Sequence, residues 1–184
     1  LGLGAGFDPH GVSGLAGDSA NADSPFSDIR VRRAVSYAID NQAIVKSLGY
    51  GFLQPANQLF TSRNWAYNPT VTGYPYDPQK AKDLLAQAGY ANGFKTSIIF
   101  GTTDNQDFFV AYQNYLSQVG INAQLQPVSA ALSTQLSTGG WKNGLLYVLI
   151  PGSAGTDPAY SLIGRLSSQS VQYVSIIRPK DYDT

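Results

Sequence analysis

Cysteine and methionine are both absent from this 184-residue chain, and histidine occurs once, at His10. Without cysteine, thiol catalysis, thiolate metal sites and a disulfide framework are excluded. A Ser-His-Asp triad or a metal site with several histidines would have to use His10, which lies in a glycine-rich stretch. We therefore expect His10 to be a solvated loop residue, and we expect no cofactor and no metal.

Charge is also scarce. Only 13% of the residues are charged, against about 25% in an average globular domain. Lys plus Arg and Asp plus Glu both number 12, so there is no net field to attract nucleic acid, an anionic membrane or an acidic substrate. Neutral polar residues must keep such a surface soluble, which suits a secreted protein.

Long hydrophobic runs and a signal peptide are missing as well. No apolar stretch approaches the roughly 18 residues that a membrane span needs. Because the chain starts at Leu1 rather than at an initiator methionine, we expect a processed product or an excised piece. Its length is still sufficient for one domain with its own core.

The first half of the chain predicts loops and two short helices. Residues 1–24 are rich in glycine and lack a sustained period, so they are interpreted as loop with at most a short strand near residues 1–7. Asp28 and Asp40 are placed to cap successive helices, and Gly49 is placed to end the second one in the left-handed conformation. A long irregular segment, residues 49–76, follows.

The second half alternates helices and strands. Asp77 and Pro78 begin the clearest helix, which Gly89 ends. Further elements are predicted as a strand at 94–100, a helix at 105–119, a strand at 121–128, a short helix at 130–137 and an apolar strand at 144–150. Asp157 and Pro158 are predicted to cap another helix toward Leu166. The result is an α/β lobe with a largely parallel or mixed sheet flanked by helices.

Three arginines, Arg30, Arg32 and Arg33, lie where the dipole of the first helix is positive. The apolar residues of this helix share one arc, so the arginines are predicted to face away from the core. Asp28 lies four residues before Arg32, a spacing at which an ion pair is worth about 0.2 to 0.5 kcal/mol. We therefore expect a solvated face rather than an anion-binding device.

Five stretches recur in a recognisable order: "PFSDIRVRRAVSYAIDNQAIV", "GYGFLQPANQLF", "YPYDPQKAKDLLAQAGY", "NYLSQVGINAQLQPV" and "TDPAYSL". Together they resemble the extracellular solute-binding proteins of family 5, the receptors of ATP-driven importers for peptides, nickel chelates, opines and sugars. The likeness covers residues 25 to about 182. Because several patterns match in sequence, it is more specific than any single one of them.

The resemblance implies a single lobe of a class II periplasmic-binding-protein-like fold. Family members are much longer and close two lobes over a solute. This chain is similar to the C-terminal lobe, with residues 1–24 as the connecting segment and residues 25–184 as the lobe. The implied protein is not an enzyme but a periplasmic or extracellular, lipid-anchored receptor, whose partners are a small solute, the missing N-terminal lobe and a membrane permease.

The loop at residues 150–160 is implied to face the solute cleft. Ligands of open α/β sheets bind beyond the carboxyl ends of the strands, which agrees with this placement. Peptide-binding relatives carry an aspartate four residues before the proline of this loop, where this chain has Ala154, so a peptide ligand is put in doubt. Predicted ligand contacts in the loop are Gly152, Ser153, Ala154, Gly155 and Tyr160. A plain strand-to-helix turn is the alternative.

Ser153 lies in "PGSAG", which resembles a nucleophile elbow only superficially, since Pro151 replaces the first glycine and no histidine is near as base. An aromatic wall for a sugar or a peptide side chain could be formed by Trp65, Tyr67, Tyr74 and Tyr76. Trp65 and Tyr67 are the predicted ligand contacts among them, and Trp141 is a further candidate. The alternative is that these rings anchor the long segment to its own lobe.

A sensory or protein-interaction module built on the same lobe is the alternative function. The flanking sequence would discriminate between the two. A lipoprotein signal and a first lobe favour the importer receptor, whereas fusion to a signalling or membrane domain favours the sensor. A hydrolase that uses Ser153 would be a third hypothesis, and it requires that serine to react with an active-site-directed phosphonate.

Overall fold

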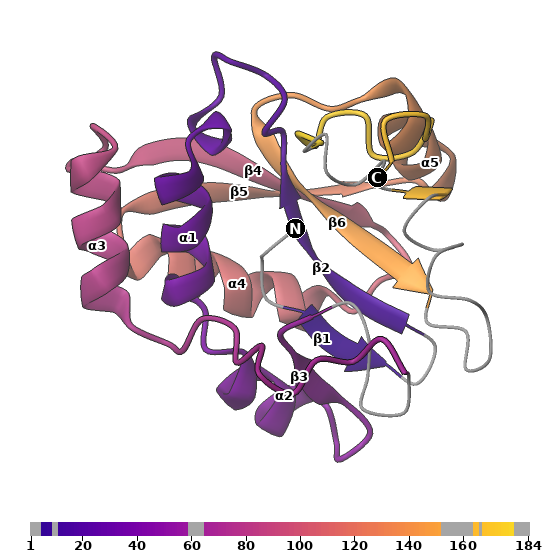
Figure 1. The fold of residues 1–184 in the computed structure, drawn as a ribbon, viewed down its shortest axis with the longest axis horizontal. Coiled ribbons are helices and arrows are strands. Elements are labelled where there is room, and N and C mark those ends of the chain that lie inside the picture. Colours follow the sequence, from indigo (N-terminus) through magenta and orange to yellow (C-terminus); the bar gives the residue numbers. More distant parts are fainter. Residues whose placement is uncertain (1–4, 9–10, 59–64, 152–163, 166, 179–184) are drawn as a thin grey trace.

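A six-stranded mixed sheet organises the computed structural model, which describes residues 5–8, 11–58, 65–151, 164–165 and 167–178 (Figure 1). The strand order is β3-β1-β2-β6-β4-β5. The strands are β1 (Ala5–Asp8), β2 (Gly11–Gly17), β3 (Gln54–Ala56), β4 (Phe94–Gly101), β5 (Ile121–Val128) and β6 (Gly144–Pro151).

The helices follow the predicted order closely. They are the 3-10 turn η1 (Pro25–Ser27) and the helices α1 (Ile29–Ala38), α2 (Asn41–Leu48), α3 (Pro78–Gln87), α4 (Gln106–Gln118) and α5 (Ala130–Gly139). The side chains of Asp28, Asp40 and Asp77 each accept a hydrogen bond from a backbone N–H in the first turn of their helices, which confirms the three predicted caps. Among the described residues, no helix combines the length and the apolar character that a membrane crossing would need.

The sheet divides into a parallel and an antiparallel half. β4 pairs in parallel with β5 on one side and with β6 on the other. β2 pairs antiparallel with β6 from Gly11↔Pro151 to Gly17↔Leu145, and β1 pairs antiparallel with both β2 and β3. The sheet is therefore mixed, one of the two arrangements that the predicted fold class allowed, because β2 enters it against the direction of β6.

The loop interpretation of residues 1–24 is wrong for β2, whereas β1 overlaps the short strand that the sequence allowed near residues 1–7. β2 lies inside the sheet between β1 and β6, and its Leu15 and Ala16 are buried. Glycine fits here because the strand is closely covered: a Cβ on Gly17 would come 2.6 Å from the ring of Phe26. Residues from the predicted connecting segment are thus part of the same sheet as the rest of the chain.

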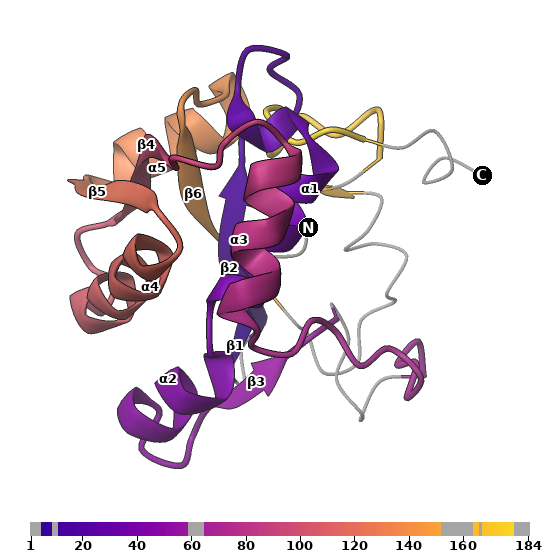
Figure 2. The ribbon, with the colours of Figure 1, turned by 90° about the vertical axis from the view of Figure 1, so that its left-hand side faces the viewer.

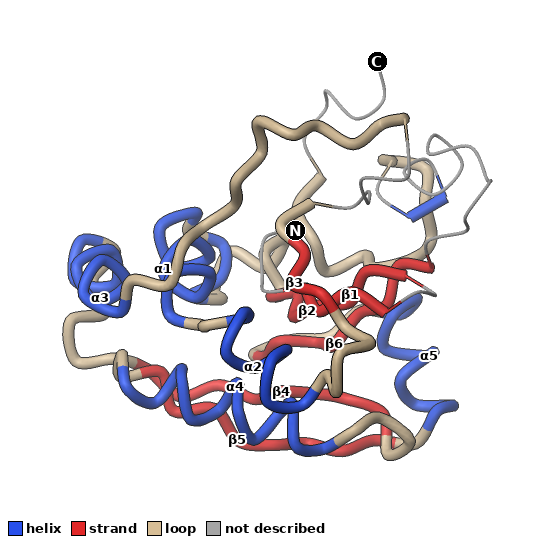
Figure 3. Tube along the Cα trace, turned by 90° about the horizontal axis from the view of Figure 1, so that it is seen from below, coloured by secondary structure: helices blue, strands red, loops and turns tan. Residues whose placement is uncertain are grey.

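Helices cover both faces of the parallel half. Ile98 and Phe100 of β4 face the larger core cluster, which contains side chains of α1, α3 and α4. Ile99 faces the second cluster on the opposite side, where Leu136 of α5 packs. Figures 1 and 3 show α1 and α3 side by side, and Figure 2 shows α4 alongside β5, while α2 and β3 lie together at one end of the molecule.

Two glycine predictions have different outcomes. Gly89 has a φ of +90° directly after α3, as expected of a helix stop, whereas Gly49 has a φ of −89°. The left-handed residues after α2 are instead Tyr50 and Gly51, so the chain turns one residue later than predicted. The predicted helix from Asp157 toward Leu166 lies outside the described residues, apart from the short helical stretch at 164–165.

Candidate functional site

The parallel strands β4, β5 and β6 end at one edge of the sheet, here called the carboxyl-end edge. Its described residues are 101–105 after β4, 128–130 after β5 and the end of β6. The backbone N–H of Thr102 donates to the carbonyl oxygen of Val128 at 2.9 Å. This hydrogen bond joins the residues at which the chain leaves β4 and β5, here called the exits of these strands. This edge is where the sequence predicts the solute contacts.

The exit from β4 is a tight polar turn. The Asp104 carboxylate accepts a hydrogen bond from the Gly101 N–H at 2.8 Å, and the Asp104 N–H donates to the Gly101 carbonyl oxygen at 3.0 Å. Asn105 then caps α4 by accepting a bond from the Asp107 N–H. The turn is thus fixed by its own side chains, while Thr102 and Thr103 remain exposed to solvent.

The chain leaves neighbouring strands toward opposite faces of the sheet. From β4 it enters α4, whose Phe109 and Leu116 belong to the larger core cluster. From β5 it enters α5, whose Leu136 packs against the second cluster. Such a divergence of two parallel neighbours is a topological switch point, the place where open α/β sheets form a crevice for ligands.

The described residues that follow β4 and β5 carry hydrogen-bonding groups and no positive charge, whereas Arg165 lies beside Tyr173 near the end of β6. Residues 101–107 and 128–139 contain Asp104 and Asp107 but neither lysine nor arginine. Ser129 caps α5, and its hydroxyl accepts a bond from the Leu132 N–H at 3.2 Å. A solute would therefore meet hydroxyls, amides and carboxylates here rather than cations.

Tyr173 is a residue at this edge that the sequence did not single out. Its phenol donates to the carbonyl oxygen of Leu149 near the end of β6 at 3.1 Å, and its N–H donates to the Ser137 carbonyl oxygen of α5. Its φ is +53°, an uncommon conformation for a bulky residue. Burial raises the pKa of the phenol, so Tyr173 acts as a neutral clamp between β6 and α5.

The predicted loop contacts cannot be placed in this geometry. Gly152, Ser153, Ala154, Gly155 and Tyr160 all lie outside the described residues. Their role in binding remains a prediction.

The predicted aromatic contacts lie in different surroundings. Trp65 is 82% exposed, and Tyr67 is partly exposed. Trp141 is only 3% exposed, and its indole N–H donates to the Gly144 carbonyl oxygen at 3.1 Å. Trp141 is therefore a packed residue of the second core cluster, which is the alternative that the sequence left open.

Two tyrosines near Trp65 anchor the long segment to helices. The ring of Tyr74 meets that of Tyr37 of α1 edge-on at 5.1 Å. The ring of Tyr76 meets that of Tyr115 of α4 at 5.5 Å in the same manner. The segment is thus held against the lobe by aromatic contacts, with Trp65 free to meet other surfaces.

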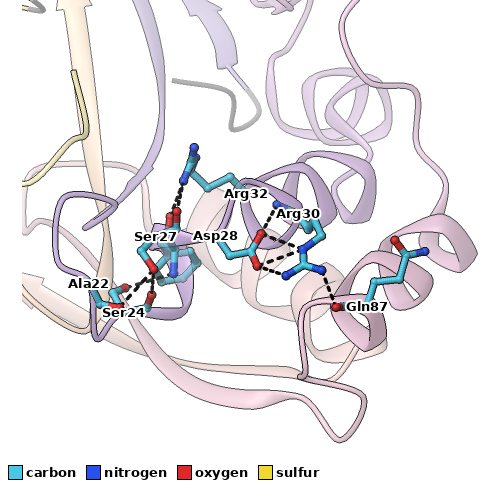
Figure 4. A network of polar contacts seen from close by, with 8 residues as sticks. Ala22, Ser24, Ser27, Asp28, Arg30, Arg32 and Gln87 are labelled. Atoms are coloured by element: carbon cyan, nitrogen blue, oxygen red, sulfur yellow. Dashed lines mark hydrogen bonds and ion pairs between the residues drawn. The ribbon is translucent and has the colours of Figure 1, made fainter. Parts of the chain in front are cut away.

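The arginines at the start of α1 have separate partners (Figure 4). Arg30 donates from Nε to both Asp28 carboxylate oxygens at 3.1 and 3.0 Å, and from Nη1 to the Gln87 carbonyl oxygen at the end of α3. This hydrogen-bonded Arg30 guanidinium holds the pKa of Asp28 below its ordinary value. The ion pair with Asp28 that the spacing allows is made by Arg30 rather than by Arg32, whose Nη1 donates to the Phe26 and Ser27 carbonyl oxygens.

The described residues contain no group of three or more His, Cys, Asp or Glu side chains that could hold a metal ion. His10 lies outside the described residues.

The sequence profile described as "Bacterial extracellular solute-binding proteins, family 5 Middle" matches residues 9–173. A heme-binding protein A of Haemophilus influenzae is 45% identical over 73 residues, which are 40% of this chain and 13% of that protein. A glutathione-binding protein GsiB of Escherichia coli is 38% identical over 108 residues, 58% of this chain and 21% of that protein. The matched part of this chain thus spans only 13% and 21% of the length of these two relatives.

Solved structures share the fold over nearly the whole chain. The periplasmic binding protein DppA of Helicobacter pylori, in complex with the peptide STSA, is 27% identical with a TM-score of 0.77 and covers 95% of this chain. The substrate-binding protein CtaP of Listeria monocytogenes covers 98% with a TM-score of 0.79 at 21% identity, and so shows the fold alone. This chain covers 33% and 37% of those two proteins.

Proposed function

The chain belongs to the bacterial extracellular solute-binding proteins of family 5, and we propose that it is one lobe of the solute-binding component of an ABC importer. In this proposal the carboxyl-end edge contacts a small polar solute, and a second lobe, outside these 184 residues, completes the enclosure. The family match over residues 9–173 carries the proposal, because it includes the exits of all three parallel strands.

The finer assignments are part of the same proposal. The lobe is the C-terminal one, the whole protein is lipid-anchored outside the membrane, and it delivers its solute to a membrane permease without catalysing a reaction. The described edge supports binding rather than catalysis, since its side chains cap helices and close turns. Gly152, Ser153, Ala154, Gly155 and Tyr160 would complete the contacts, together with Trp65 and Tyr67.

The solute class is proposed from the chemistry of the edge. The described exits of β4 and β5 lack lysine and arginine but carry Asp104 and Asp107. Such an edge suits the uncharged or cationic part of a solute, for example an amide, a hydroxyl or an ammonium group. Two relatives are named for heme and glutathione, and two solved structures of similar fold hold the peptide STSA and a nickel–histidine complex, so these four are natural probes.

Amide NMR shifts of the 184-residue chain test where a solute binds. Titration with glutathione, the peptide STSA, nickel–histidine and heme should give saturable shifts with one probe at least. We expect the largest shifts at Thr102, Thr103 and Ser129. Saturable shifts confined to helices α2 and α3, away from the carboxyl-end edge, would contradict the proposed site.

A further inference from the structure

A pocket lies between α1 and β2, and none of its lining residues belongs to the carboxyl-end edge. Its cavity volume is about 190 Å³. Four segments of the chain contribute to it, and its lining includes Ile29, Arg32, Arg33 and Ser36 of α1, Leu15 of β2, and Tyr74. The pocket continues into a more open groove of about 580 Å³. Ser19 and Ile176 line both.

Two positive charges line this pocket, and neither Arg32 nor Arg33 forms an ion pair with a carboxylate of the described residues. Within the described part of the chain, the only ion pair is that of Arg30 with Asp28. In Figure 4 Arg32 lies on the opposite side of Asp28 from Arg30. Burial lowers the pKa of Arg32, the Asp28 carboxylate raises it, and the nearby positive charge of Arg33 lowers it again.

Arg32 has two donor nitrogens, Nε and Nη2, that are not used in the hydrogen bonds of its Nη1. Nη1 is occupied by the carbonyl oxygens of Phe26 and Ser27 at 2.8 and 2.9 Å. Among the described residues, no group accepts a hydrogen bond from Nε or Nη2. These two nitrogens form one planar edge of the guanidinium, and such an edge binds both oxygens of a carboxylate in parallel.

The volume of the pocket and the polarity of its lining further restrict which chemical group it can bind. Ligand pockets for whole metabolites usually measure about 300 to 1,000 Å³, so this pocket accommodates a single chemical group. Buried Leu15, Ala16 and Ile176 supply an apolar lining beside the arginines. A carboxylate on a short aliphatic stem satisfies both, because its stem meets the apolar lining while its oxygens meet the guanidinium groups.

We propose that the pocket between α1 and β2 is a binding site for a carboxylate on a short aliphatic stem, held by Arg32 and Arg33. Either a free short-chain acid or an acidic side chain of a polypeptide can present this group. The proposal does not depend on the proposed function, since none of its residues belongs to the carboxyl-end edge.

Arginine-detected NMR on the 184-residue chain tests the site. The probes are glutarate, N-acetyl-glutamate N-methylamide, inorganic phosphate and, as the uncharged control, N-acetyl-glutamine N-methylamide. We expect saturable shifts of the Arg32 and Arg33 Nε–H signals with millimolar carboxylate. The glutamine control should bind at least about tenfold more weakly, because it lacks the charge-assisted hydrogen bonds.

The relative affinities of glutarate and N-acetyl-glutamate N-methylamide show whether the bound carboxylate comes from a free acid or from a polypeptide side chain. Tighter binding of the glutamate derivative indicates a polypeptide side chain, and tighter binding of glutarate indicates a free acid. Equal responses to the glutamate and glutamine derivatives would overturn the proposal, as would preferential binding of phosphate.

A matched pair of variants assigns the effect to the pocket. Arg33→Gln should weaken carboxylate binding by about tenfold or more, since one of the two charges is lost. Arg33 is chosen because Arg32 also holds the carbonyl groups of η1. Lys82→Gln removes one exposed positive charge from α3 and should leave binding unchanged. Equal weakening by both variants would show a non-specific effect of net charge and overturn the assignment.

Discussion

Arg30 joins Asp28, the cap of α1, to Gln87, the last residue of α3. One guanidinium binds the Asp28 carboxylate through Nε and Nη2 and the Gln87 carbonyl oxygen through Nη1. The start of one helix is thereby fastened to the end of its neighbour. This contact also places a positive charge at the negative end of the α3 dipole.

Removal of the Asp28 side chain should destabilise the fold. Asp28→Ala loses the cap on the Arg30 N–H and the partner of the guanidinium, so we expect the free energy of unfolding to fall by about 1 kcal/mol. Denaturant unfolding followed by circular dichroism measures this. The exposed Asp23 serves as control, and Asp23→Ala should change stability by less than about 0.5 kcal/mol. Equal effects of the two variants would contradict the capping role.

The same carboxylate should make stability depend on acidic pH. Because the folded pKa of Asp28 lies below its ordinary value of 3.8, the unfolded chain binds more protons in this range. The contribution is present above the unfolded pKa and is lost as pH falls through the folded pKa. Between pH 5 and about pH 2 the parent chain should therefore lose more stability than Asp28→Asn, as unfolding curves at each pH will show. Equal losses of stability in the parent chain and in Asp28→Asn would exclude a contribution of the Asp28 pKa to the pH dependence.

Asp18 should contribute more to stability than an exposed aspartate such as Asp23. It is fully buried, and its carboxylate accepts bonds from the Ser24 hydroxyl at 2.6 Å and the Asn143 N–H at 2.8 Å. In Asp18→Asn an amide group replaces one acceptor oxygen and meets these donors, so we expect a loss of about 1.5 to 3 kcal/mol. Asp23→Asn is the matched control. A loss of less than about 0.5 kcal/mol for Asp18→Asn would show that the network contributes little.

Gly93 should not tolerate a side chain. Its φ is +71°, and a Cβ there would approach the Gly120 carbonyl oxygen to a distance that no real structure accommodates. Gly93→Ala should therefore cost more than the roughly 1 to 2 kcal/mol of the left-handed conformation alone. Gly139→Ala, at a position with nothing within 4 Å of the added Cβ, should be neutral or stabilising. Comparable melting temperatures for the two variants would contradict the close approach.

The helices could be predicted because their signals are local. Asp28, Asp40 and Asp77 each precede an apolar pattern of helical period, and each caps a helix as expected. β4 and β5 were found in the same way, since an alternating or apolar run is visible within a few residues.

β2 could not be predicted because its partners are distant in sequence. The stretch GVSGLAG has small residues and no alternation, and it becomes a strand through seven residues of pairing with β6, more than 100 positions later. Its glycines, which suggested a loop, instead allow Phe26 to lie directly on Gly17. Burial in the sheet thus overrides a weak local preference.

The site was predictable only in outline. Parallel strands predict a ligand edge at their carboxyl ends, and the structure brings those ends together. Tyr173 could not be found, because its importance depends on a left-handed backbone and on contacts with Leu149 and Ser137. The pocket of Arg32 and Arg33 was missed because the arginines were predicted to form a solvated face of α1, and the segments that meet that face are distant in sequence.

The account depends most on the claim that this lobe supplies only part of a solute site. Isothermal titration calorimetry of the 184-residue chain against the solute panel used for NMR tests it most directly. With half of the enclosure absent, each solute should bind more weakly than micromolar or give no measurable heat. Binding at micromolar affinity or tighter by this chain alone would contradict the two-lobe account.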